Sequence, residues 1–342
     1  MVTVKDIAKH ASVSPATVSK VLNKKTNVAP KTVAAIELAM TELGYRRSSR
    51  GKPKGVSYGK KRSNRIALLT HGQPDAWINS PVYTAALRGV SRACNEKGIT
   101  LVLSEFAGDS PMPKNIFAQA VDGVILFGEP TDPRIIKILR THSCVQMLQL
   151  RPKHALWDYV SYNNSKVGFI AANYLLESGQ RNVAVVSLKS ELGLFGQRVD
   201  DFTQTIEMAG GTVLKLADNE LVNEEGETQR VVHSRMEAAV ASILSSKPAV
   251  RGVFLVADIL AQSFYSELLR RSVKPDVDIK IISCNNEELL LSGLCPRPAT
   301  IDIFPEQIGR GAVEQVLKRI KLTGLPQATN LLEPALVTGS PL

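Results

Sequence analysis

The sequence predicts a small all-α unit joined to a larger α/β body of two lobes. Three short helical stretches separated by turns lie within the first 45 residues, which is the arrangement of a helix-turn-helix headpiece. From residue 66 onward, apolar runs typical of strands alternate with amphipathic helical stretches, and this alternation favours parallel sheets covered by helices. Because the alternation comes in two series, we expect two Rossmann-like lobes with a ligand-binding cleft between them.

The domain boundaries follow from these patterns. We expect the headpiece at 1–45, a basic linker at 46–65 and the α/β body at 66–342. Within the body, we expect the N-lobe at about 66–163 and 298–325, and the C-lobe at about 164–297 and 326–342. The predicted strands are Ile66–Leu69, Thr100–Leu103, Gly123–Phe127, Cys144–Leu150, Val183–Ser187, Thr212–Leu216, Gly252–Val256 and Ile279–Ser283. The predicted helices of the body are Val82–Lys97, Pro133–Thr141, Lys166–Ser178, Val199–Ala209, Gln229–Ser245 and Asp258–Arg270.

The composition excludes several classes of protein. The chain has 342 residues, of which 44% are hydrophobic and 22% charged, as in an ordinary globular protein. No run of about 18 apolar residues occurs, and the first residues lack the apolar segment of a secretory signal, so we expect a cytoplasmic protein with no membrane span. The 4 cysteines form no CxxC pair, and the chain carries no GxGxxG, P-loop or GxSxG motif. We therefore expect no metal, no cofactor and no enzyme activity.

The positive charge is concentrated at the start of the chain. The formal net charge is +10, but residues 1–65 alone carry fifteen Lys and Arg against Asp6, Glu37 and Glu42. The rest of the chain is therefore nearly neutral. A basic head on a neutral body indicates that the head binds a polyanion such as nucleic acid. The alternative is a solvated basic region that only aids solubility.

Each headpiece helix begins at residues suited to that position. Thr3 precedes the first helix and Asp6 follows three residues later, the spacing of a capping box. Ser14 and Pro15 begin the second helix as N-cap and first helical residue. The third helix is expected from Lys31 to Leu43. Apolar residues at helical spacing give the three helices a shared core, which we expect to contain Ile7, Ala8, Ala11, Val18, Val21, Leu22, Val33, Ile36, Ala39, Met40 and Leu43.

The second helix is the expected recognition helix. In a helix-turn-helix unit this helix enters the major groove, and its outward residues must be small or polar. Ala16 and the methyl group of Thr17 can contact a thymine methyl group, whereas Lys20 can donate to guanine. The amides at the start of the helix, together with Ser14, suit a phosphate. The residues expected to contact DNA in the headpiece are Thr3, Ser14, Pro15, Ala16, Thr17, Ser19, Lys20, Asn23 and Thr26.

The headpiece sequence resembles that of the LacI/GalR family of bacterial transcription regulators. The segments VTVKDIAKHASVSPATVSKVLN and VAPKTVAAIELAMTELGY carry this resemblance. The chain departs from the family at Ser12, where glycine or asparagine is usual, and at the variable positions Pro15 and Ala16. The body is similar to the family's effector domain, which is built like a periplasmic sugar-binding protein, and the matching stretches are Val121–Gly128, Val160–Ser187, Phe254–Asp258 and Pro298–Gly309. The resemblance implies a homodimeric repressor that binds a DNA operator and a small effector.

The linker differs from that of most family members, in which a short hinge helix inserts a leucine into the minor groove. Here Gly51, Pro53 and Gly55 disfavour a helix, and no leucine lies between Leu43 and Leu68. The segment from Arg50 to Gly55 resembles an AT-hook instead, with cations on either side of an extended Gly/Pro core. We expect minor-groove contacts from Arg50, Gly51, Lys52 and Lys54. The alternative is a basic tether that only screens phosphates.

The family's effector contacts imply a set of site residues in the body. Arg198 matches the arginine that binds the ligand, and Asp258 is also retained. Amides stand where the family has carboxylates at Gln149, Asn163 and Asn285. Because amides do not repel anions, one hypothesis is a negatively charged ligand such as a sugar acid or sugar phosphate. The alternatives are a neutral sugar and a site that has lost its ligand. Trp77 and Tyr83 are further candidates, since aromatic rings stack on sugars, although core packing would explain them equally well.

The sequence therefore favours a repressor of a carbohydrate-utilisation operon whose operator affinity depends on a sugar-like effector. A second hypothesis is an architectural DNA-binding protein that uses the body only to dimerise. A third, a sugar-processing enzyme with a DNA-binding head, lacks any nucleophile or paired acid and base. The chain carries no C-terminal leucine heptad, so we expect a dimer without a tetramer-forming helix.

Overall fold

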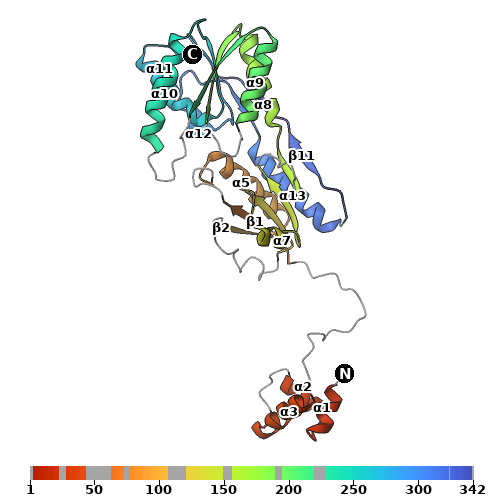
Figure 1. Cartoon of the computed structure of the whole chain (residues 1–342). Helices are drawn as coiled ribbons and strands as arrows, with labels where there is room; N and C mark the ends of the chain where they lie inside the picture. The colour runs from red at the N-terminus through yellow and green to blue at the C-terminus, as the bar shows by residue number, and fades with distance from the viewer. Residues whose placement is uncertain are drawn as a thin grey trace. The chain divides into compact units, whose positions relative to one another are not determined.

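The structure is a computed structural model of the whole chain. It describes residues 3–22, 28–43, 63–72, 78–106, 121–148, 156–188, 195–218, 228–322 and 324–340. The chain divides into two compact units, Met1–Lys60 and Lys61–Leu342, and each is described by itself. The first unit contains the headpiece and the second contains the α/β body (Figure 1).

The headpiece is the predicted three-helix unit. Its helices are α1 (Val4–His10), α2 (Pro15–Leu22) and α3 (Pro30–Glu42). Ile7, Val18 and Ile36, one from each helix, are fully buried and form the centre of the core. The predicted capping box is present at α1, where the Thr3 side chain accepts from the Asp6 N–H and the Asp6 side chain accepts from the Thr3 N–H. Ser12 lies in the turn before α2 with φ 54°, a left-handed conformation that explains why glycine or asparagine suits this position.

The N-lobe is an α/β layer structure around one parallel sheet. The six strands lie in the order β11-β5-β4-β3-β1-β2, and every neighbouring pair is parallel. Its strands are β1 (Arg65–His71), β2 (Thr100–Phe106), β3 (Gly123–Phe127), β4 (Ser143–Met147), β5 (Asp158–Tyr162) and β11 (Thr329–Leu332). Its helices are α5 (Pro81–Glu96), α7 (Pro133–Leu139) and α13 (Pro305–Lys321).

Both faces of this sheet are covered by helices. Along β1, Ile66 and Leu68 belong to the core under α5 and α13, whereas Ala67 and Leu69 belong to the core under α7. This alternation follows from the two-residue period of a strand. Helices α5 and α13 lie side by side (Figure 1), and their contact needs a glycine, since a Cβ atom at Gly309 would lie 2.0 Å from the carbonyl oxygen of Ala86.

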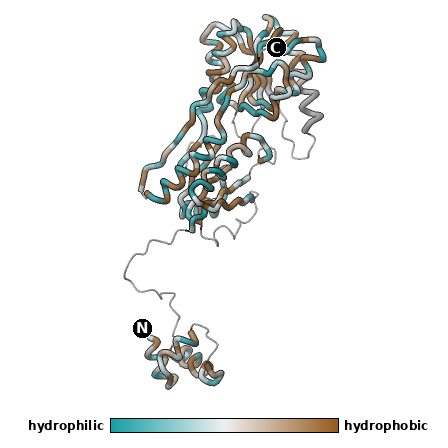
Figure 2. Tube along the Cα trace, turned by 180° about the vertical axis from the view of Figure 1, so that it is seen from behind, coloured by the Kyte–Doolittle hydropathy of each residue, from teal (hydrophilic) through white to brown (hydrophobic). Residues whose placement is uncertain are grey.

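The C-lobe has a parallel four-stranded sheet in the order β7-β6-β8-β9 and a short antiparallel pair β10-β12. Its strands are β6 (Asn182–Leu188), β7 (Thr212–Asp218), β8 (Gly252–Leu255), β9 (Lys280–Ile282), β10 (Thr300–Asp302) and β12 (Ala335–Val337). Its helices are α8 (Asn164–Glu177), α9 (Gly196–Met208), α10 (Thr228–Ser245), the 3-10 turn η1 (Asp258–Leu260), α11 (Ala261–Arg270) and α12 (Glu288–Leu291). Figure 2 shows hydrophobic and hydrophilic stretches alternating along both lobes. None of the described helices is long and apolar enough to cross a membrane.

The chain passes between the lobes three times. The crossings join β5 to α8, β10 to α13 and β11 to β12. The first and third crossings are bonded to each other, because the Asn163 N–H donates to Leu332 O at 2.9 Å and its side-chain amide donates to Glu333 Oε1 at 3.0 Å. In the second crossing Phe304 adopts a left-handed φ of 53°, held by a bond from its N–H to Asp302 Oδ1 at 2.7 Å.

Two segments lie in a different lobe from the one that the sequence predicts. Residues 298–302 lie in the C-lobe, because β10 pairs with β12, and residues 329–332 lie in the N-lobe, because β11 pairs with β5. The second crossing therefore falls near Phe304 instead of residue 298, and the third near Glu333 instead of residue 326. Helices α12 and α13 and strands β5, β10 and β11 were not among the predicted elements.

Candidate functional site

The outward surface of α2 is the first candidate site. Ser14, Pro15, Ala16, Ser19 and Lys20 are exposed, Thr17 is half-buried and Val18 points into the core. The exposed side chains are therefore the small and polar ones, as insertion into a groove requires. The start of α2 is ordered by Ser14, whose Oγ accepts from the Thr17 N–H at 3.1 Å and lies 2.8 Å from Thr17 Oγ1.

Several predicted DNA contacts remain predictions. Thr3 is exposed, and its hydroxyl is engaged in the α1 capping box, donating to Asp6 Oδ2 at 2.7 Å. These bonds lower the pKa of Asp6 below its ordinary value, through the Thr3 hydroxyl first and the Thr3 N–H second. The remaining candidates, Asn23, Thr26, Arg50, Gly51, Lys52 and Lys54, lie outside the described residues.

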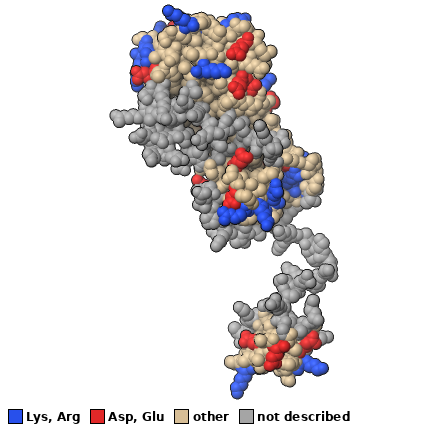
Figure 3. All heavy atoms as spheres, in the orientation of Figure 1, with Lys and Arg blue, Asp and Glu red and all other residues tan. Residues whose placement is uncertain are grey.

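The charge of the headpiece is more even than that of the whole N-terminal region. Figure 3 shows both Lys or Arg and Asp or Glu side chains on its described part. Nine of the fifteen basic residues of the first 65 belong to the linker segment 46–65, which has no acidic residue. The positive excess therefore belongs mainly to the linker, whereas α2 offers small polar side chains for contacts with bases.

The second candidate site is centred on Arg198, near the start of α9. Arg198 is 1% exposed, which is exceptional for an arginine. Its Nε donates to Asn164 Oδ1 at 2.8 Å, and its Nη2 donates to the Tyr162 hydroxyl at 2.8 Å. Its Nη1 donates to Val256 O and, at 3.4 Å, to Asn285 Oδ1. The guanidinium is thus held by three side chains and one backbone carbonyl, which lie at or just after the carboxyl ends of strands of both lobes.

Asp258 lies close to Arg198 but is enclosed by its own partners. Its carboxylate accepts from the hydroxyls of Ser283 and Thr300 and from the Glu287 N–H, the last at 2.7 Å. Burial raises the pKa of Asp258 to about 6, and those hydrogen bonds oppose the rise. The side chain is fully buried, and its described contacts all lie within the C-lobe. Asp258 therefore supports the neighbouring residues of the site.

Asn285 reaches the site from an unusual backbone conformation. It has φ 113°, and the next residue, Asn286, has φ 55°. Asparagine tolerates positive φ better than most residues. The positive φ angles therefore give a second reason for asparagine at positions 285 and 286, besides the hypothesis of a negatively charged ligand.

The other predicted effector residues are placed elsewhere or not described. Asn163 caps α8 and bonds to Glu333, so it holds the crossing between the lobes. The hydroxyl of Tyr83 lies 2.8 Å from Thr70 Oγ1, and its ring packs 4.7 Å from that of Phe127, which places it in the N-lobe core. Trp77 and Gln149 lie outside the described residues.

Sequence reasoning missed three members of the site, Tyr162, Asn164 and Glu287. Glu287 is only 8% exposed, and its N–H donates to Asp258 Oδ2 at 2.7 Å. Burial, reinforced by the charge of Asp258, raises the pKa of Glu287 to about 7. In the sequence, Glu287 could have been identified as a candidate by its position directly after Asn285 and Asn286. We call Tyr162, Asn164, Arg198, Asp258, Asn285 and Glu287 the interlobe cluster.

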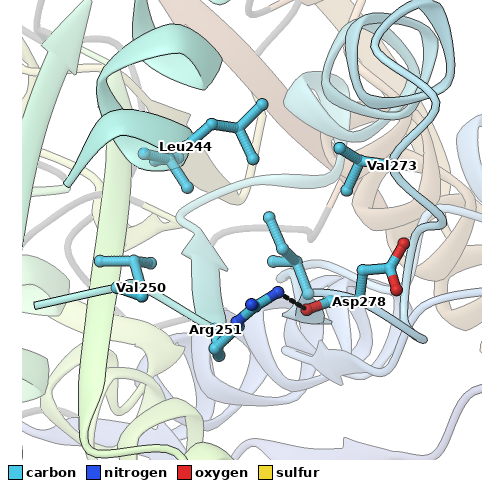
Figure 4. Close-up of a pocket in the computed structure, with 8 residues that line it drawn as sticks. Leu244, Val250, Arg251, Val273 and Asp278 are labelled. Atoms are coloured by element: carbon cyan, nitrogen blue, oxygen red, sulfur yellow. Dashed lines mark hydrogen bonds between the residues drawn. The ribbon is translucent and has the colours of Figure 1, made fainter.

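A pocket of about 260 Å³ lies at the other end of the C-lobe strands (Figure 4). It is lined by Leu244, Val250, Val273 and Asp278, with Arg251 donating to Asp278 O at 3.3 Å. These residues precede β8 and β9, whereas ligands of parallel α/β sheets bind at the carboxyl ends. The pocket therefore does not coincide with the interlobe cluster. Among the described residues, no group of three His, Cys, Asp or Glu side chains is placed to hold a metal ion.

Comparisons with known proteins match both parts of the chain. Residues 3–48 match the family described as bacterial regulatory proteins, lacI family. Residues 172–340 match the periplasmic binding protein-like domain. These two matches correspond to the headpiece and to most of the body.

Individual relatives match over nearly the whole length. The chain is 27% identical to the ribose operon repressor of Escherichia coli strain K12 over 343 residues, covering 98% of each chain. It is 25% identical to the transcriptional repressor PurR of Photobacterium profundum, covering 94% of this chain and 92% of the relative. A structure of the lac repressor dimer bound to operator shares the fold, with a TM-score of 0.65 at 17% identity and coverage of 99% and 98%. The chain thus has a headpiece that matches the lacI family of bacterial regulatory proteins and a body that matches the periplasmic binding protein-like domain, and it is similar over nearly its whole length to two named repressors.

Proposed function

We propose that the chain is a homodimeric transcriptional repressor of a carbohydrate-utilisation operon, and that a small sugar at the interlobe cluster sets its affinity for the operator. The observation that carries this proposal is the exposed, small and polar face of α2 on a three-helix unit. Two copies of such a unit suit a pseudo-palindromic site with half-sites about one helical turn apart. The named function of the Escherichia coli relative, repression of the ribose operon, supports the carbohydrate class. A protein with this target works in the cytoplasm.

Lys20→Ala tests the recognition helix. We expect the variant to lose about 1–3 kcal/mol of binding to the selected operator and to discriminate less between bases at one position, because Lys20 donates to a guanine edge. The measurement is fluorescence anisotropy on an operator selected from random duplexes, with single-base variants. Lys9→Ala is the control, since it removes an exposed lysine from α1 and should leave base discrimination unchanged. An equal effect of both substitutions on discrimination would contradict the assignment of α2.

The charges of the interlobe cluster favour a neutral sugar over an anionic one. Arg198 is already bonded to Tyr162, Asn164 and Asn285, and the buried acids Asp258 and Glu287 lie close to it. An anion would be repelled by those acids, and within the described interlobe cluster the one cation, Arg198, is already hydrogen-bonded. Hydroxyl groups can instead both donate and accept at the amides and carboxylates.

Thermal unfolding with a panel of neutral sugars and sugar acids tests the effector. A ligand present at about 100 times its Kd adds about 2.7 kcal/mol to the free energy of unfolding. We expect a neutral sugar to raise the unfolding temperature, and Arg198→Lys to abolish the rise because lysine lacks the planar guanidinium fork. Stabilisation by sugar acids alone would contradict the neutral effector. A protein that no sugar stabilises would support the architectural alternative.

The linker is proposed to contact the minor groove in the manner of an AT-hook. Substituting Arg50 and Lys52 by alanine should weaken binding more at operators with an A/T centre than at operators with a G/C centre, because the narrow A/T minor groove attracts cations most strongly. Titration of both operator types at one salt concentration measures the difference. Equal losses at the two centres would support a basic tether that only screens phosphates.

A further inference from the structure

The amino ends of the N-lobe strands carry a group of exposed cations. In a parallel sheet each helix returns the chain to the amino edge, so α5, α7 and α13 end there. A Cβ atom at Gly123, the first residue of β3, would lie 2.6 Å from Val316 and 3.0 Å from Ile320, which places the end of α13 over this edge. Figure 3 shows Lys and Arg side chains near the lower end of the N-lobe. The exposed cations at the three helix ends are Lys97, Lys137, Arg140, Lys318 and Lys321, and we call them the basic end.

These cations have no counter-ions in the described part of the body. None of the five forms an ion pair with another described residue. Two acids of the same edge, Glu96 and Asp158, are bound by Arg310 and Arg319 of α13 instead. Glu314, one turn further back on α13, is exposed and likewise forms no ion pair with a described residue. The edge therefore keeps an excess of positive charge that the body does not neutralise.

Helix dipoles alone do not account for the basic end. A cation near a helix C-terminus is stabilising through the dipole, and this holds equally for both lobes. Yet α8, α9 and α10 of the C-lobe have no basic residue in their last turn, whereas α7 and α13 of the N-lobe do. At the end of α11, Arg270 pairs with Glu267 of its own helix at 3.3 Å. Cations without partners at helix ends are thus a feature of the N-lobe, and this favours a partner outside the body.

The linker enters the body at the same edge. The N–H groups of Ser63 and Asn64 donate to the two carboxylate oxygens of Asp122, at 2.9 and 2.8 Å, and Asp122 lies directly before β3. The linker segment 46–65 carries nine basic residues and no acidic one. Its positive charge is therefore continued by the basic end. Of the whole body, this edge is also the nearest along the chain to the headpiece.

We infer that the basic end is a second DNA-contacting surface, which binds backbone phosphates of the duplex that the headpiece recognises. The inference rests on the proposed function, because the headpiece is taken to bring the duplex to the body. Lys and Arg bind phosphates whatever the base sequence. Each neutralised phosphate releases counterions, so the affinity falls as the salt concentration rises. The basic end therefore adds to the affinity for any duplex and adds nothing to discrimination between sequences.

The test compares triple variants of the full chain that carry the same change in net charge. The basic-end variant combines Lys97→Gln, Lys137→Gln and Lys321→Gln, one lysine from each helix end. The matched control combines Lys215→Gln, Lys247→Gln and Lys274→Gln, three exposed lysines of the C-lobe. A third variant places arginine at positions 97, 137 and 321 and so keeps the charge. Fluorescence anisotropy measures the affinity for a selected operator and for a scrambled duplex over a series of salt concentrations, and the unfolding temperature shows that each variant is folded.

We expect the basic-end variant to bind both duplexes more weakly than the parent, with an unchanged ratio between the two affinities. Its plot of log affinity against log salt should be shallower by about 0.9 for each lost contact, or about 2.7 per protomer for all three. The C-lobe control and the arginine variant should keep the slope of the parent. A basic-end variant with the same slope as the parent and the control would overturn the inference.

A second measurement needs no variant. An acetylating reagent is applied to the parent protein with and without the operator duplex, and mass spectrometry reports the modification of each lysine. We expect the duplex to protect Lys97, Lys137 and Lys321 and to leave Lys247 and Lys274 as reactive as before. Unchanged reactivity at the basic end would also overturn the inference. A parent protein that binds operator and scrambled duplex equally would contradict the proposed function alone, so the two failures are distinguishable.

Discussion

Replacing Arg319 by alanine is expected to destabilise the N-lobe by about 3–5 kcal/mol, because it leaves a buried carboxylate without its counter-ion. The side chain of Asp158 is fully buried, and Arg319 binds it through two donors, one of them Nε at 2.6 Å. Gln315 and the Ala328 N–H also donate to Asp158. The network joins β5, α13 and the segment before β11. Urea unfolding at pH 7 measures the loss.

Arg310→Ala is the matched control for this prediction. Arg310 also lies on α13 and also binds a carboxylate through two donors, at 3.0 and 2.7 Å to Glu96, but the two side chains are 37% and 54% exposed. Exposed pairs contribute about 0–1 kcal/mol. A loss in Arg319→Ala no greater than in Arg310→Ala would show that burial of Asp158 does not govern its contribution.

The same network has a defined pH dependence. Burial opposes ionisation of Asp158, but hydrogen bonds from Arg319, the Ala328 N–H and Gln315 outweigh it and hold the pKa of Asp158 below its ordinary value. The stabilisation is therefore present above the ordinary pKa of 3.8 and is lost as pH falls through the lower folded value. In Arg319→Ala, the pKa of Asp158 rises, so acid unfolding should begin at a higher pH.

Gly168→Ala is expected to damage the effector site by displacing the backbone of Arg198, without direct contact with its guanidinium. A Cβ atom at Gly168 on α8 would lie 2.3 Å from Arg198 O and 2.7 Å from Phe202 N on α9. Helix α9 must shift, and overpacking of this kind costs about 1–3 kcal/mol. Because Arg198 moves with α9, we expect both a lower unfolding temperature and weaker stabilisation by sugar.

Gly196→Ala separates packing from helix propensity. Gly196 lies on α9 itself, and a Cβ atom there meets nothing within 4 Å. Alanine is favoured over glycine in helices by about 1 kcal/mol, so this variant should be as stable as the parent or more so. Equal behaviour of the two variants would contradict a close contact between α8 and α9.

Local structure could be predicted from the sequence wherever residues close together along the chain determine it. The capping box at Thr3, the helix start at Pro15 and the strand Gly123–Phe127 are all confirmed. Strand β11 was missed because three of its four residues are exposed, so only its pairing with β5 defines it. The lobe boundaries were misplaced for the same reason, since strand partners distant in sequence decide which lobe a segment joins.

The candidate site was only partly predictable. The sequence identified Arg198, Asp258 and Asn285, which the structure brings together. It also grouped Asn163 and Tyr83 with them, which the structure places at a crossing and in a core. Glu287 was missed because no local sequence pattern indicates that this acidic side chain will be buried.

The interleaving of the two lobes also affects the order in which the chain can fold during synthesis. The N-lobe begins with β1, but α13 and β11, which complete its core and its sheet, follow the whole C-lobe sheet in the sequence. The four strands β7-β6-β8-β9 are all present once Ile282 has been made. Domains fold as units as they leave the ribosome. We therefore expect the C-lobe sheet to form on the nascent chain before the N-lobe, although the N-lobe begins to emerge first.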